Sequence, residues 1–273
     1  WLTGRRFRAT SVKIMQDGVP ENGSAAMLDP YLDGRGGGTT TNRGHSYVEA
    51  AALCEHVTGL DAAGFQVHVH AIGDRAVREA LDAVAEARRR NGLTDNRHHI
   101  AHVQVVHPDD VPRFAEVGAA ATIQPLWAAY DQQMLRLTLP VLGEERARWQ
   151  YPFGDLHRTG AVLAGGSDWP VSTPDPMAGI HVAVNRTLPP ALAEGDDRAF
   201  LPEQAIDLAT ALTAYTAGSA YVNHLDDAGT LTVGALADVV VLDRDPFEQP
   251  ATEIADCRVL QTWVGGDLVS GGW

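Results

Sequence analysis

The stretch FQVHVHAIGDRAV, residues 65–77, predicts a strand that leads directly into a helix. Its first six residues alternate between apolar and polar, which places His68 and His70 on one face of the strand. Asp74 is a suitable N-cap for the helix, and an apolar stripe at helical spacing continues until Gly92 ends it. The stretch is therefore expected to supply part of a βαβ unit.

The same alternation of strand and helix recurs on both sides of this stretch. Further strands are predicted at residues 6–15, 98–106, 119–124 and 161–167, and helices at 46–63, 108–117, 176–187 and 202–218. Strands separated by helices of ten or more residues indicate parallel pairing, so the expected fold class is α/β. The last part of the chain, 229–243 and 257–272, is rich in β-formers and predicts strands of a small separate domain.

One connecting segment has an unusual composition. Residues 33–44, DGRGGGTTTNRG, are rich in glycine, threonine and asparagine. Such a segment is typical either of a mobile lid over a site or of a passive connector, and the sequence favours neither interpretation.

Composition excludes several classes of partner. The chain has 21 basic and 35 acidic residues and a net charge of −14, which disfavours nucleic acid and anionic membranes. Two cysteines make no disulfide framework, and no apolar run approaches the roughly 20 residues of a membrane span. The first ten residues lack the apolar core of a signal peptide, so a cytoplasmic enzyme is expected. Because the first residue is Trp1 rather than methionine, a truncated chain is also expected.

Four predicted strand ends carry residues with catalytic chemistry: Lys13, His70, His102 and Asp168. Sites in parallel α/β folds are built at the carboxyl ends of the strands. Imidazole and carboxylate groups suit Zn²⁺, which lowers the pKa of bound water and polarises a carbonyl, and a nearby carboxylate can accept the proton of that water.

Each of these residues also has a structural interpretation. Asp168 is able to cap a turn, and Lys13 is able to pair with Asp17 at the strand end. His68 is a secondary candidate ligand. In the next strand, alternation puts His98 and His102 on one face. The remaining histidines are expected to be structural or solvated: His45, His56, His98, His99, His107, His157, His181 and His224.

Several motifs together resemble a known family. The segments HAIGDRAV (70–77), HIAHVQ (99–104), GSDWPVS (166–172) and GTLTVGALADVVVLD (229–243) resemble the amidohydrolase superfamily, and most closely its amidohydrolase-3 branch of YtcJ-like proteins. VKIMQDG (12–18) resembles the fourth-strand motif of that branch.

The resemblance implies a (β/α)₈ TIM barrel of the metal-dependent hydrolase type and a small β-sandwich. Residues 1–224 would form the C-terminal portion of the barrel and 225–273 would form sandwich strands. His70, His102 and Asp168 would end strands five, six and eight and bind one or two metal ions, with Zn²⁺ as the expected ion and Asp168 as the general base. Lys13 would correspond to the lysine that becomes carboxylated and bridges two metals.

The chain departs from the family pattern in one respect. The HxH pair that the family carries on strand one is not in this sequence. A complete barrel takes about 250 residues, so the chain is expected to supply strands four to eight only. It is expected to form a homo-oligomer or to recruit a separate N-terminal segment, because an open sheet exposes its edges.

The expected function is hydrolysis of an amide or another C–N bond of a small molecule, with metal-activated water attacking a carbonyl. Within the same class, the alternatives are a deaminase and a cyclic amidase. The alternative from another class is a non-catalytic or incomplete fragment that needs a partner segment for activity.

Overall fold

The computed structural model describes residues 2–4, 7–35, 38–193 and 195–271. By its internal contacts the chain divides into two compact units, which are described separately. The first comprises Trp1–Thr122 and Gln132–Val162, and the second comprises Ile123–Asp131 and Leu163–Trp273.

A parallel sheet forms the centre of the first unit. Strands β3 (Ser11–Met15), β4 (Gln66–Ala71), β5 (His99–His102) and β6 (Ala120–Ile123) pair in that order, and each neighbouring pair is parallel. The register sets Lys13 opposite His68, and His68 opposite His99. The α/β class and the parallel pairing predicted from the sequence are therefore confirmed.

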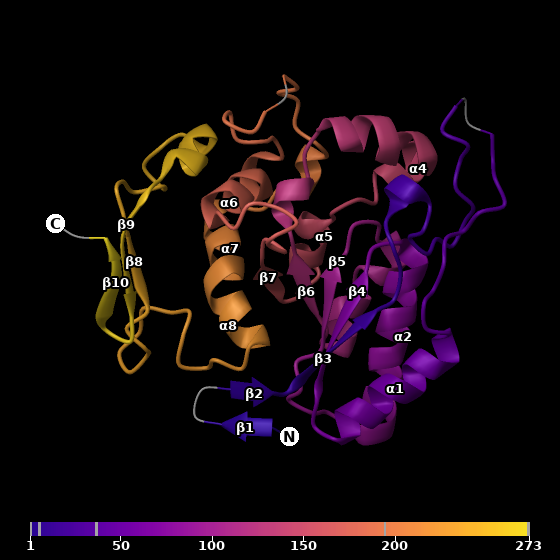
Figure 1. The fold of residues 1–273 in the computed structure, drawn as a ribbon, viewed down its shortest axis with the longest axis horizontal. Coiled ribbons are helices and arrows are strands. Elements are labelled where there is room, and N and C mark those ends of the chain that lie inside the picture. The colour runs from indigo at the N-terminus through magenta and orange to yellow at the C-terminus, as the bar shows by residue number, and fades with distance from the viewer. Residues whose placement is uncertain (1, 5–6, 36–37, 194, 272–273) are drawn as a thin grey trace. The chain divides into compact units, whose positions relative to one another are not determined.

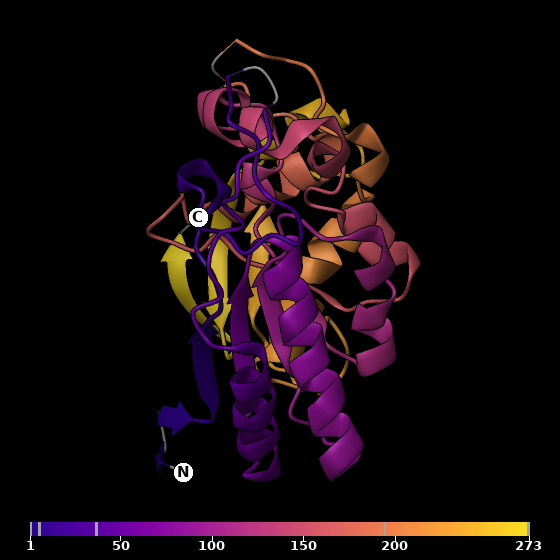
Figure 2. The same ribbon diagram turned by 90° about the vertical axis from the view of Figure 1, so that its right-hand side faces the viewer.

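Two helices cover one face of this sheet. Helices α1 (Ala50–Ala62) and α2 (Asp74–Asn91) pack against each other and against β4, as Figures 1 and 2 show. Val67 and Val69 of β4 are buried on this side. The apolar stripe predicted for α2 is buried as expected, and the helix ends at Gly92, whose φ of 82° lies in the left-handed region.

The start of α2 differs from the prediction. The N-cap is Gly73, and Asp74 is the first helical residue. Glycine is required at position 73 because a Cβ there would lie 2.1 Å from the carbonyl oxygen of Ala26. The Asp74 carboxylate accepts hydrogen bonds from the backbone N–H groups of Leu28 and Arg75.

The long connection between β3 and α1 is anchored to this helix start. It contains a 3₁₀ turn, η1 (Pro20–Asn22), and a bridge between Leu32 and Thr39. Buried side chains of the connection share a core with residues of other segments: Ala25, Met27, Tyr31, Ile72, Val105 and Leu142. Residues 36–37 of the glycine-rich run lie outside the described residues, and the choice between lid and connector stays a prediction.

The remaining elements of the first unit are short. A two-stranded hairpin, β1 (Leu2–Gly4) with β2 (Phe7–Ala9), precedes β3, so the single strand predicted at 6–15 is wrong. The helix predicted at 108–117 is split into η2 (Pro108–Asp110) and α3 (Arg113–Val117), with Pro112 as the N-cap of α3. After these come a π turn η4 (Met134–Thr138), α4 (Leu139–Ala147) and α5 (Phe153–Arg158).

The second unit contains the last short strand of the α/β pattern, β7 (Leu163–Gly165). Its turns and helices are η3 (Pro125–Trp127), α6 (Pro176–Asn185), η5 (Pro202–Gln204), α7 (Leu208–Thr213), η6 (Ala214–Gly218) and α8 (Ser219–Val222). An antiparallel sheet of β8 (Val239–Leu242), β9 (Val259–Val264) and β10 (Asp267–Gly271) follows, with η7 (Ala251–Asp256) between β8 and β9. Of the strand predicted at 229–243, only β8 forms.

Two further observations concern the whole described chain. None of its described helices has the length and apolar character needed to cross a membrane. Both cysteines are free thiols, and burial raises the pKa of each, which makes them poor nucleophiles at neutral pH.

Candidate metal centre

Strands β3 and β4 bring Lys13, His68 and His70 to one face of the sheet. The register pairs Lys13 with His68 and Met15 with His70. Val67 and Val69 of β4 lie on the side of α1 and α2. Because successive side chains of a strand alternate between its two faces, His68 and His70 lie on the face opposite to these helices. The Lys13 Nζ lies 3.0 Å from the His68 Nε2.

Strand β5 adds His99 to this face. The register sets His99 opposite His68, and the two ring centroids are 4.3 Å apart. The sequence alternation grouped His98 with His102 on one face and so left His99 on the other face. This grouping is wrong, because His99 lies on the same face as His68. The sequence alternation was assigned with the wrong phase, because the phase of so short a strand is set by its pairing with β4.

His98 points instead toward α1 and has a structural role. Its Nδ1 accepts a hydrogen bond from the Val67 N–H at 3.0 Å, and its Nε2 lies 2.9 Å from the Asp61 Oδ1. Burial opposes ionisation of Asp61, but hydrogen bonds from several side chains hold the pKa of this carboxyl below its usual value. The expectation that His98 is structural is confirmed.

The buried contacts of His98 predict how the free energy of unfolding depends on pH. Burial lowers the pKa of His98 below its usual 6.5, although Asp61 acts in the opposite direction. Protonation would also turn the His98 Nδ1 from an acceptor into an N–H donor, which would then face the N–H donor of Val67. An unfolded chain therefore binds a proton on this ring at pH values where the folded chain does not, so the free energy of unfolding falls as the pH decreases below 6.5.

The variant His98→Gln removes this proton linkage. The pH dependence of its free energy of unfolding, measured by urea denaturation between about pH 7.5 and about pH 5, is expected to be shallower by up to ~1.4 kcal/mol per pH unit. The change His157→Gln, at an exposed position of α5, is the matched control. An unchanged slope in His98→Gln would contradict the prediction.

His102 reaches the site because the backbone turns at the end of β5. The φ of His102 is 76° and that of Val103 is 44°, both in the left-handed region that a β-branched residue rarely adopts. The His102 ring consequently meets the His70 ring edge-on, with centroids 4.5 Å apart and an interplanar angle of 65°. Both side chains are buried. The structure thus brings two of the four predicted ligands into contact.

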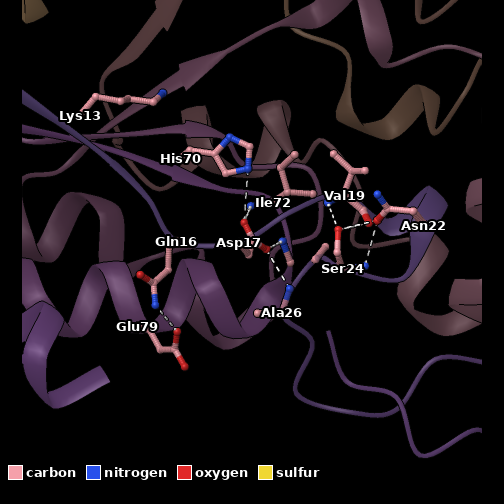
Figure 3. Close-up of polar contacts among 12 residues, drawn as sticks. Lys13, Gln16, Asp17, Val19, Asn22, Ser24, Ala26, His70, Ile72 and Glu79 are labelled. Atoms are coloured by element: carbon pink, nitrogen blue, oxygen red, sulfur yellow. Dashed lines mark hydrogen bonds and ion pairs between the residues drawn. The ribbon is translucent and has the colours of Figure 1, made fainter. Parts of the chain in front are cut away.

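Asp17 is a site residue that the sequence interpretation placed wrongly. Its buried carboxylate accepts backbone hydrogen bonds from Ala26, Ile72 and Gly73 at 2.8–3.0 Å, and its Oδ1 lies 3.5 Å from the His70 Nε2. Figure 3 shows the carboxylate beneath the His70 ring, with the Lys13 side chain well away from it. The interpretation that Lys13 pairs with Asp17 therefore does not describe this arrangement.

The charge states of this face follow from its burial. Burial raises the pKa of Asp17 to about 7, while the three backbone donors act to lower it. Burial also lowers the pKa of His68 to about 2, and the neighbouring His99 and Lys13 add to this effect. His68 is therefore neutral at physiological pH, which is the state in which imidazole binds a metal.

Asp168 belongs to the second unit, where it follows β7. Its backbone carbonyl accepts a hydrogen bond from Val171 at 2.9 Å, its φ is 55°, and its side chain is exposed. The residue thus sits in a turn, as its structural interpretation expected. Its predicted role as ligand and general base stays a prediction.

The donor set fits part of a metal site. His70 and His102 supply two imidazoles in contact, which is the donor type that Zn²⁺ prefers. Among the residues that the structure describes, no group of three or more histidine, cysteine, aspartate or glutamate side chains is arranged to hold a metal ion.

The whole chain is similar to known proteins. The sequence pattern of the Amidohydrolase family matches residues 2–270. The chain belongs to this family. It is 34% identical to Protein LONG AFTER FAR-RED 3 of Arabidopsis thaliana over 257 residues, which are 93% of this chain and 42% of that protein. It is 28% identical to the putative amidohydrolase YtcJ of Bacillus subtilis, over 98% of this chain and 48% of YtcJ.

Two further proteins are also similar to this chain. It is 25% identical to the N-substituted formamide deformylase of Arthrobacter pascens, over 96% of the chain and 46% of the deformylase. A crystal structure of an uncharacterized metal-dependent hydrolase from Pyrococcus furiosus matches with a TM-score of 0.72 and 31% identity, over 90% of this chain and 47% of that one. The family predicted from the motifs is confirmed, and the chain spans about half the length of the relatives it matches.

Proposed function

We propose that the chain forms part of a metal-dependent hydrolase that cleaves an amide or another C–N bond of a small molecule. The observation that carries this proposal is the edge contact between His70 and His102 at the ends of neighbouring parallel strands. The similarity to an N-substituted formamide deformylase supports a C–N bond as the target.

In this proposal Lys13, His70, His102 and Asp168 hold the metal, and His68 is a secondary ligand. Zn²⁺ is the expected ion, because imidazole and carboxylate are its usual ligands in proteins. A divalent ion held there would polarise a carbonyl and lower the pKa of a water molecule. Carboxylation of Lys13 would turn a cation into an anionic oxygen ligand, and the Asp168 carboxylate would accept the proton of the attacking water.

The proposed architecture follows from the strand pairing and from the similarity to a solved hydrolase structure. Strands β3 to β7 would be strands four to eight of a (β/α)₈ barrel, and the sheet β8–β10 would be part of a small β-sandwich. Parallel pairing from β3 to β6 and the structural similarity to the Pyrococcus furiosus hydrolase support this assignment. The proposed domain boundary is at residues 224–225.

A second candidate is an incomplete chain that becomes active only with a partner, either a second copy or a segment that carries the HxH pair. The observation that favours it is that the contact between His70 and His102 supplies two imidazoles, whereas a zinc site in a protein usually has three or four protein ligands. Within the enzyme class, a deaminase and a cyclic amidase remain the alternatives.

The test of the proposed function is a screen of N-formyl amines, linear amides and cyclic amides by product detection. Hydrolysis of one of these classes should disappear when a chelator removes the metal and should return when Zn²⁺ is added. Hydrolysis that a chelator leaves intact would contradict the proposal. Activity that appears only after addition of an HxH-carrying segment would favour the second candidate.

A further inference from the structure

We propose that Gln124 is a substrate-binding residue, whose side-chain nitrogen Nε2 donates a hydrogen bond to the carbonyl oxygen of the amide that is hydrolysed. The inference rests on the proposed function and deepens it by adding a group that stabilises the reacting carbonyl. Neither the sequence motifs nor the proposed ligand set includes this residue.

Gln124 occupies a place in the fold where such a group is expected. It directly follows β6 (Ala120–Ile123), and sites in parallel α/β folds are built at the carboxyl ends of the strands. The N–H of Gly166, the residue after β7, donates to the Ile123 carbonyl at 3.0 Å, so the ends of β6 and β7 lie side by side. Gly166 comes two residues before Asp168, the proposed general base, and these residues all belong to the second unit.

The side chain of Gln124 is buried without stabilising the fold. The residue is 5% exposed, and its Oε1 is enclosed without a hydrogen-bond partner among the described residues. A buried acceptor of this kind lowers stability, because the hydrogen bond that it makes to water in the unfolded chain is not replaced. An apolar side chain of similar length, such as methionine, would avoid this cost. Stability therefore does not explain why a glutamine is present.

The amide nitrogen of Gln124 lies beside a position that has room for a ligand. Apart from its chain neighbours, a Cβ built on Gly166 would come within 4 Å of one described atom, the Gln124 Nε2 at 3.9 Å. A Cβ on the preceding Gly165 would instead lie 2.4 Å from a ring carbon of Tyr215. The space between Gly166 and the Gln124 amide is therefore open enough to admit a ligand atom.

The chemistry of the amide nitrogen identifies the part of the substrate that it would contact. Nε2 carries two N–H donors and no acceptor, so its partner in a neutral amide is the carbonyl oxygen. When water attacks the carbonyl carbon, this oxygen gains negative charge. An N–H donor that is already in place stabilises that charge more strongly than it stabilises the ground state, and so it accelerates the reaction.

The first measurement is the urea midpoint of unfolding. Gln124→Met is expected to keep or raise the midpoint of the parent, because it removes an acceptor that has no partner. Gln66→Met is the matched control: Gln66 is also buried, but its Nε2 donates to the Arg97 carbonyl at 3.0 Å, so its loss should lower the midpoint. A fall in Gln124→Met as large as that in Gln66→Met would overturn the inference, because Gln124 would then be a structural residue.

The second measurement is kcat in a preparation that hydrolyses a small amide. Gln124→Met is expected to lower kcat by about 10–100-fold with little change in KM, the effect of losing a hydrogen bond to a developing charge. Gln66 begins β4, at the end of the strand away from the carboxyl edge, and Gln66→Met is expected to keep the parental kcat. Both variants should retain the zinc content of the parent, which separates loss of the donor from loss of the metal.

The outcomes distinguish the inference from the proposed function. Parental kcat in Gln124→Met, in a preparation where Asp168→Asn is impaired, would overturn the inference and leave the proposed function standing. A rise in KM with unchanged kcat would also overturn it, since the contact would then not strengthen in the transition state. If no preparation hydrolyses any of the screened amides, the proposed function itself fails and the inference fails with it.

Discussion

Asp168→Asn is expected to reduce the rate of amide hydrolysis by about 10²–10⁴-fold, the usual contribution of a general base. Asparagine has nearly the same shape as aspartate but does not accept a proton from water near neutral pH. The measurement is kcat in a preparation that hydrolyses a small amide. The loss should appear in kcat more than in KM, because the proton is transferred only in the transition state.

A neighbouring aspartate provides the control for this experiment. The Asp175 side chain accepts from the Met177 N–H at 2.9 Å and caps α6, seven residues after Asp168. Asp175→Asn changes the same functional group in the same unit and is expected to leave kcat within about threefold, since asparagine caps a helix about as well as aspartate. Equal rates in Asp168→Asn and the parent protein would exclude Asp168 as the base.

His102→Ala is expected to remove the bound metal. The change deletes one of the two imidazoles whose rings are in contact, and the loss of affinity should exceed the roughly 100-fold upper effect of losing a residue behind a ligand. Elemental analysis of the purified protein, before and after dialysis against a chelator, measures the zinc that each variant retains. His157→Ala, on the exposed side of α5, controls for zinc held at surface histidines.

The His102→Ala experiment also needs a measurement of stability, because His102 occupies a left-handed backbone conformation. Histidine is one of the residues enriched at positive φ, so alanine adds backbone strain there, and stability must be measured beside the zinc content. A loss of zinc without a change in the unfolding midpoint would therefore show loss of a ligand rather than loss of the fold. Retention of parental zinc content in His102→Ala would remove His102 from the ligand set.

The sequence predicted those parts of the site that depend on local periodicity. The alternation in FQVHVH placed His68 and His70 on one face, and the pairing of β3 with β4 agrees with that placement. The end of α2 at Gly92 was also predicted, because a glycine in the left-handed conformation is a local signal. The family itself was evident from four separate motifs.

The sequence did not predict contacts that depend on pairing between distant segments. A four-residue strand such as β5 has two possible phases, and only its register with β4 puts His99 beside His68. His102 contacts His70 because the backbone turns at residues 102–103, and the alternation of a regular strand does not predict such a turn. The contacts of Asp17 were missed because its partners, at positions 26, 72 and 73, come together only in the fold.

The way Asp17 is held determines which part of the connection after β3 can be exchanged in a chimeric protein. Its partners are backbone N–H groups, so the contact itself does not specify side chains at 26, 72 or 73, although Gly73 must stay small. The bridge between Leu32 and Thr39 lies farther along the same connection. A graft that shifts Ala26 would therefore also shift the Asp17 carboxylate, which contacts His70 of the histidine pair.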